Sequence, residues 1–139
     1  KKTRMMHNDS HKFESQFLGL TIQAHHSVML GSLAGSKLGI WVAHGEGKFN
    51  LPLPLDRYNV VAKYSYNAYP ANPNGSRSGV AGICSDDGRH LAMMPHLERA
   101  IFPWQCGYNP ASRHTDEVTP WIDAFINARK WVEAKLSSH

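Results

Sequence analysis

Two residues in the second half of the chain have side chains suited to acid–base chemistry. His96 and Glu98 stand two positions apart in the run MMPHLER, residues 93–99. In an extended segment, residues i and i+2 point to the same side, so this imidazole and carboxylate can meet. A carboxylate that holds one ring nitrogen orients the other to take a proton from a thiol or hydroxyl. The pair supplies a base and its orienting group, but no nucleophile.

A second histidine and glutamate with the same spacing lie earlier, in WVAHGEG, residues 41–47. The apolar β-formers of residues 37–44 predict a strand, and Gly45 and Gly47 predict a turn after it. Ligands often bind where strands of α/β folds end. His44, Gly45 and Glu46 are therefore candidates for ligand binding. The residues alone also allow a turn that merely tolerates polar side chains.

Several other elements follow from local patterns. Strands are expected at residues 17–24 and 60–66, with a short helical or turning piece at 25–30. Residues 79–85 and 89–94 predict a hairpin around the Asp86–Gly88 turn. Thr119 and Pro120 predict the start of a helix. Its apolar stripe is expected to face the core: Trp121, Phe125, Ala128 and Val132.

The composition is that of an ordinary globular chain. It has 139 residues, 42% hydrophobic and 19% charged, which fits one domain or less. A net charge of +4 with scattered basic residues gives no reason to expect nucleic-acid binding. No apolar run has the length of a membrane span, so we expect no membrane contact. Two cysteines without a secretory segment favour reduced thiols and a cytoplasmic location.

Five strings, in order along nearly the whole chain, resemble the carboxyl-terminal part of the phosphoribosylformylglycinamidine synthase family. The first joins Asn8–Ser10 to Phe13–Ser15, and the second is WVAHGEGKF at residues 41–49. The others are YPANPNGS at 69–76, GVAGICSDDGRHLAMMPHLER at 79–99 and PWIDAFINARKWV at 120–132. Together they are far more specific than any one string. The resemblance therefore identifies the chain as a member of this family.

The resemblance implies a class I glutamine amidotransferase domain, in which a cysteine attacks the side-chain amide of glutamine. It implies that His96 is the base and Glu98 its orienting group. It also implies that the backbone at His44, Gly45 and Glu46 holds the α-amino and carboxylate groups of glutamine. The family often has proline at the position of Leu97, and we expect this departure to leave the chemistry intact. The implied fold is α/β: the carboxyl-terminal half of a flavodoxin-like, three-layer domain with a mixed sheet.

The nucleophile that the family requires has no match in this chain. Its cysteine lies on a Gly-x-Cys-x-Gly elbow, which exposes the sulfur and directs backbone amides at the oxyanion. Cys84 lacks the second glycine, and we expect it to be a small buried strand residue. Cys106 follows an aromatic loop without an elbow.

The elbow is therefore expected upstream of Lys1, so residues 1–139 would form a partial glutaminase domain. We expect this piece alone to be inactive. The missing upstream half is its expected partner, and without that half the open sheet edge and apolar surface favour self-association.

The resemblance further implies that ammonia released from glutamine reaches a synthetase region of the same polypeptide. There ATP and magnesium would activate formylglycinamide ribonucleotide. Both sites would lie outside residues 1–139, so no cofactor or metal is expected in this chain.

Two other functions remain open from the residues. His44, His96 and either Glu46 or Glu98 could be ligands of a metal-assisted hydrolase. The chain could instead be a binding domain without chemistry. Residues 72–77 could form a phosphate cradle or a rigid turn, with the turn favoured. His7 and His11 have a zinc-like spacing, although Asn8–Ser10 between them disfavour a helix.

Overall fold

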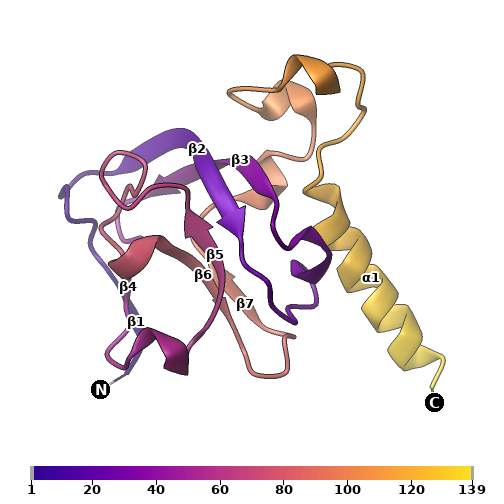
Figure 1. Ribbon diagram of the computed structural model, residues 1–139, viewed down its shortest axis with the longest axis horizontal. Coiled ribbons are helices and arrows are strands. Elements are labelled where there is room, and N and C mark those ends of the chain that lie inside the picture. The colour runs from indigo at the N-terminus through magenta and orange to yellow at the C-terminus, as the bar shows by residue number, and fades with distance from the viewer. Residues whose placement is uncertain (1, 139) are drawn as a thin grey trace.

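Seven strands and one α-helix form the regular structure of the computed structural model, which describes residues 2–138 (Figure 1). The strands are β1 (Arg4–Met6), β2 (Glu14–Ile22), β3 (Lys37–His44), β4 (Lys48–Asn50), β5 (Asn59–Tyr64), β6 (Val80–Cys84) and β7 (Leu91–Met93). The helix α1 covers Ile122–Leu136, and short 3-10 turns connect several of these elements. Among the described residues, no helix has both the length and the apolar character needed to cross a membrane.

The main sheet has the order β3-β2-β5-β6-β7, and every pairing in it is antiparallel. A two-stranded antiparallel sheet, β1 with β4, lies beside it. The main sheet curls strongly, and an isolated bridge from Trp41 to His96 joins β3 to the segment after β7 (Figure 1).

The expectation of a mixed sheet in three layers is wrong for these residues. Parallel neighbours need a long crossover, usually a helix. Here β2 connects to β3, and β5 to β6, through irregular segments without an α-helix. The single α-helix follows the last strand and covers only one side.

Local sequence patterns located most strands well. The strand expected at 37–44 is β3 with the same bounds, and the predicted hairpin is β6 and β7 around the Asp86–Gly88 turn. Gly88 has a φ of +72°, which favours glycine. The strand expected at 17–24 begins earlier, at Glu14, because its first residues pair with the end of β3.

The main core lies between the curled sheet and the segments that carry Leu30, Leu97 and Trp121. Trp121 is 1% exposed, and its indole N–H donates to the carbonyl of Gly39 at 2.9 Å. Thr119 anchors the helix start by donating to the carbonyl of Ala100 at 2.5 Å and accepting from the amide of Trp121 at 3.3 Å. The predicted start at Thr119 and Pro120 therefore falls just before the helix.

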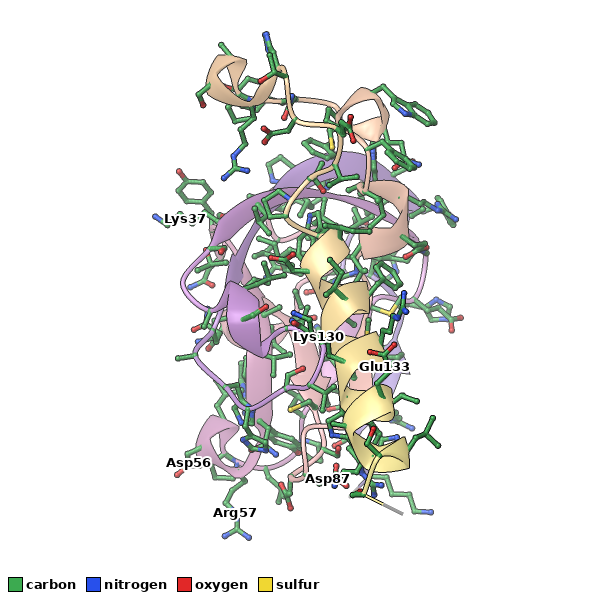
Figure 2. All side chains as sticks on the ribbon, turned by 90° about the vertical axis from the view of Figure 1, so that its right-hand side faces the viewer. Lys37, Asp56, Arg57, Asp87, Lys130 and Glu133 are labelled. Carbon is green, nitrogen blue, oxygen red and sulfur yellow. The ribbon has the colours of Figure 1, made fainter. Side chains whose placement is uncertain are left out.

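The prediction that the whole helical stripe is core is only partly right. Trp121 and Ala124 are buried, whereas Phe125 and Val132 are 40% and 48% exposed. The first turns of α1 pack near residues 29–33, where Asn127 donates to the carbonyl of Met29 at 3.0 Å. Figure 2 shows Lys130 and Glu133 labelled along the helix, which lies toward the viewer in that view. Nothing within the described residues covers the carboxyl-terminal part of the stripe.

Candidate functional site

His96 and Glu98 come together just after β7. The amide of His96 donates to the carbonyl of Trp41 at 2.8 Å, which ties this residue to β3. The 3-10 turn Leu97–Arg99 begins directly after it and brings Glu98 back. His96 Nδ1 and Glu98 Oε1 are 2.7 Å apart. The two side chains thus meet across a 3-10 turn rather than along an extended strand. Leu97 between them is buried in the core.

Glu98 is ionised in this arrangement. Partial burial raises its pKa, but the hydrogen bond from His96, its own backbone and the nearby Arg99 together hold the pKa below its ordinary value. A carboxylate at Nδ1 favours the tautomer with the proton on that nitrogen. Nε2 of His96 is then the free acceptor. Both side chains line an open cavity of about 390 Å³ with Met29, Met93 and Phe125.

His44 is held in a different way from His96. It ends β3 opposite Glu14 of β2, and both residues are buried, at 4% and 8% exposed. Neither ring nitrogen of His44, nor Oε1 of Glu14, has a hydrogen-bond partner within residues 2–138. A methyl group at Gly47 would lie 2.5 Å from the His44 ring, so the glycine packs directly on it.

The environment of His44 disfavours its charged form. Burial lowers its pKa most, and the neighbouring His96 lowers it further, while its own backbone and Glu14 act in the opposite direction. His44 is therefore neutral at neutral pH. The isolated bridge between His96 and Trp41, three residues before His44, brings the two candidate regions close together.

The other two members of the 44–46 set face the surface. Gly45 is half-buried and Glu46 is exposed. The carboxylate of Glu46 lies 3.5 Å from Nδ1 of His7, and both side chains are largely exposed. The structure therefore separates the ring of His44 from the side chain of Glu46, and only the backbone of the turn connects them.

Asn8 and Glu14 are parts of this region to which the sequence analysis gave no role, and Gly47 was predicted only as part of the turn. Asn8 is fully buried and donates its side-chain amide to the carbonyl of His44 at 2.7 Å. Nothing in the local pattern around Asn8 indicates this contact, since its partner lies 36 positions away. The distinguishing feature of Asn8 is the complete burial of a polar side chain, which is visible only in the folded structure.

The metal-site alternatives have no matching geometry in the described part of the chain. Within residues 2–138, no three histidine, cysteine or acidic side chains gather as a potential metal site. This weakens the metal-hydrolase interpretation of His44, His96, Glu46 and Glu98, and the zinc interpretation of His7.

The two cysteines have other neighbours than His96. Cys84 is half-buried at the end of β6, and its sulfur lies 3.4 Å from Nδ1 of His25. Cys106 is also half-buried and approaches the carbonyls of Ala100 and Phe102. Burial raises the pKa of both thiols, and Asp86 and Asp87 raise that of Cys84 further. Neither sulfur is bonded to His96, the candidate base.

The segment 72–77 is a tightly bonded loop. The amides of Gly75 and Ser76 are bound by the side-chain oxygens of Asn72 and Asn74, at 3.1 and 3.0 Å. Arg77 donates to the carbonyl of Leu53 at 2.6 Å. These groups are already engaged, so the structure favours the rigid turn over a phosphate cradle.

The curled antiparallel sheet with one helix has a counterpart among solved structures. PurLQS from Thermotoga maritima superposes on 95% of this chain with a TM-score of 0.68 and 23% sequence identity, and the match covers 54% of that chain. At this identity the likeness concerns the fold alone.

The sequence places the chain within a family. The family model described as the CobB/CobQ-like glutamine amidotransferase domain matches residues 1–132, and the chain belongs to this family. It is 40% identical to human phosphoribosylformylglycinamidine synthase over 91% of its length. It is 43% identical, over 94%, to an Arabidopsis thaliana protein named "Probable phosphoribosylformylglycinamidine synthase, chloroplastic/mitochondrial". In both cases it spans 10% of the relative.

Proposed function

We propose that this chain supplies the histidine and glutamate of a glutaminase site that belongs to a phosphoribosylformylglycinamidine synthase of purine biosynthesis. The observation that carries the proposal is the 2.7 Å contact between His96 Nδ1 and Glu98 Oε1 beside an open cavity. Membership of the glutamine amidotransferase family and the similarity to a tenth of such synthases support it.

The proposed chemistry begins with a cysteine outside residues 1–139, since neither Cys84 nor Cys106 is bonded to His96. Nε2 of His96 accepts the thiol proton as sulfur attacks the carboxamide of glutamine. Glu98 stabilises the imidazolium and holds its orientation. The same proton then passes to the departing ammonia, and water hydrolyses the resulting glutamyl thioester.

The ammonia would serve a ligase reaction elsewhere in the parent polypeptide. There ATP and magnesium would activate formylglycinamide ribonucleotide, and ammonia would give the amidine. In this proposal residues 1–139 are a partial domain, and its missing half carries the nucleophile elbow. Glutamine, the upstream half and the synthetase region are its partners.

Glutaminase activity after mixing tests the proposal. The chain is assayed for glutamate formation alone and with a separately made upstream segment carrying the Gly-x-Cys-x-Gly elbow. We expect activity only in the mixture, and its loss in a mixture with His96→Ala. His90→Ala, which removes an exposed histidine elsewhere, is the matched control and should stay active. If the two segments are shown to associate and the mixture still has no glutaminase activity, the result would favour a binding domain without chemistry.

The orienting role of Glu98 has a separate test. We expect Glu98→Gln to lower kcat in the active mixture by about 10²- to 10⁴-fold, because the amide neither stabilises the imidazolium nor fixes its tautomer. Glu133→Gln, at an exposed glutamate of α1, is the control. If both variants turn over like the wild type, Glu98 has no part in the reaction.

A further inference from the structure

Asn8 binds the turn after β3 through three hydrogen bonds. Its backbone amide donates to the carbonyl of Gly45 at 2.9 Å, and its side-chain nitrogen donates to the carbonyl of His44 at 2.7 Å. Its side-chain oxygen accepts from the amide of Gly47 at 3.0 Å. The remaining side-chain hydrogen goes to the carbonyl of Lys12 at 2.9 Å. Both side-chain N–H groups and the side-chain oxygen of Asn8 are thus hydrogen-bonded, with 0% of the residue exposed.

These contacts leave a particular pair of groups available. With the carbonyls of His44 and Gly45 and the amide of Gly47 occupied, the amides of Gly45 and Glu46 have no hydrogen-bond partner within the described residues. Gly45 is half-buried and Glu46 exposed, so a ligand can reach them. Two adjacent free donors at the surface suit an anionic oxygen group rather than an ammonium group.

We propose that Asn8 is a positioning residue that holds the Gly45 and Glu46 amides as a seat for the α-carboxylate of glutamine. The inference rests on the proposed function and narrows it, because the turn is assigned to bind the α-carboxylate of glutamine and not its α-amino group. The seat adjoins His44, whose pairing with Glu14 and packing under Gly47 fix the end of β3. Asn8 itself touches no substrate and acts only through this turn.

The α-carboxylate takes no part in bond breaking, so its binding is equally strong in the ground state and the transition state. Loss of such uniform binding raises KM and leaves kcat nearly unchanged. In the active mixture described above, we expect Asn8→Ala to raise KM for glutamine about tenfold or more, with kcat within about threefold of the wild type. For 4-aminobutanamide, which is glutamine without its α-carboxylate, Asn8→Ala should have the same KM as the wild type.

Asn74→Ala is the matched control. Asn74 is also 0% exposed, and its side chain binds the hydroxyl of Tyr64 and the amide of Ser76, without a hydrogen bond to residues 44–47 among the described residues. A general loss of packing would affect both variants and both substrates. Only the proposed role predicts a KM effect confined to Asn8→Ala and to glutamine. Asn8→Ser, which keeps one shorter donor and acceptor, should fall between wild type and Asn8→Ala, and it replaces Asn8→Ala if that variant does not fold.

The outcomes separate the two proposals. No activity in the wild-type mixture would contradict the proposed function. Activity with an unchanged KM in folded Asn8→Ala or Asn8→Ser, or an equal KM rise for 4-aminobutanamide, would overturn the role of Asn8 alone. Hydrogen exchange on the chain itself tests the clamp without any activity: the Gly47 amide should be protected in wild type and Asn74→Ala, and exposed in Asn8→Ala. Equal protection in all three would overturn it.

Discussion

At the scale of single residues, the two histidines of the site differ in what surrounds their rings. His96 has a carboxylate partner and lines a cavity, whereas His44 is buried without a partner for either ring nitrogen in the described structure. Burial is the main cause of the lowered pKa of His44. His96 is therefore placed to exchange a proton with a substrate. His44 is suited to stay neutral and to keep the end of β3 in place.

The lowered pKa of His44 predicts a dependence of stability on pH. The unfolded chain protonates His44 near pH 6.5, while the folded chain resists until a lower pH. This contribution to stability is complete above pH 6.5 and is lost as the pH falls from there through the folded pKa. When the pH is lowered from about 7.5 to about 5.5, we expect the free energy of unfolding to fall less in His44→Gln than in the wild type, as measured by urea titrations. His90→Ala is the control, and identical pH dependence in His44→Gln and wild type would contradict the assignment.

Spacing in the sequence predicted the contact between His96 and Glu98, because a short separation limits where two side chains can lie. It could not predict Asn8, whose partners lie 36 and 39 positions away. It also gave no sign that the ring of His44 is buried while Glu46 is exposed. Neighbouring residues in a turn diverge according to what packs on each side, and that depends on the tertiary fold.

At the scale of elements, the turn between β3 and β4 depends on two glycines with different surroundings. A methyl group at Gly47 would lie 2.5 Å from the His44 ring, whereas one at Gly45 would meet only Phe13, at 3.9 Å. We expect Gly47→Ala to lower the free energy of unfolding by about 1–3 kcal/mol, as overpacking does. Gly45→Ala is the matched control and should change it much less. If urea titrations give both variants the same loss in the free energy of unfolding, the His44 ring moves aside at little cost and the prediction is wrong.

Elements with strong local signals were predictable, and those that depend on neighbours were not. The apolar run of β3 and the Asp86–Gly88 turn determine their own structure. The α1 stripe was assigned to the core from its period alone, yet Phe125 and Val132 are exposed. Periodicity identifies an apolar face but not whether anything covers it. The mixed sheet came from the family resemblance, and the strands of this portion pair only antiparallel.

At the scale of the whole molecule, the outer part of α1 gives the surface an apolar stripe. Phe125, Val132 and Leu136 follow helical spacing and are 40%, 48% and 70% exposed. Exposed stripes of this kind favour association. We expect the isolated chain to form larger species with rising concentration in sedimentation velocity, and Val132→Glu with Leu136→Glu to reduce this. Ala134→Glu, exposed on the opposite side of the helix, should not. A chain that stays monomeric throughout would contradict the prediction.

The hydrogen bonds of Asn8 also bear on the order of events in folding. They close a loop of almost forty residues, and such contacts form late because the entropy of closure must first be overcome. The turn that Asn8 holds would then mature after the β2–β3 pairing. A contact absent from the transition state governs how fast the native state opens rather than how fast it forms. Asn8 would thereby set the lifetime of the ordered turn, and its loss would accelerate unfolding with little effect on the refolding rate.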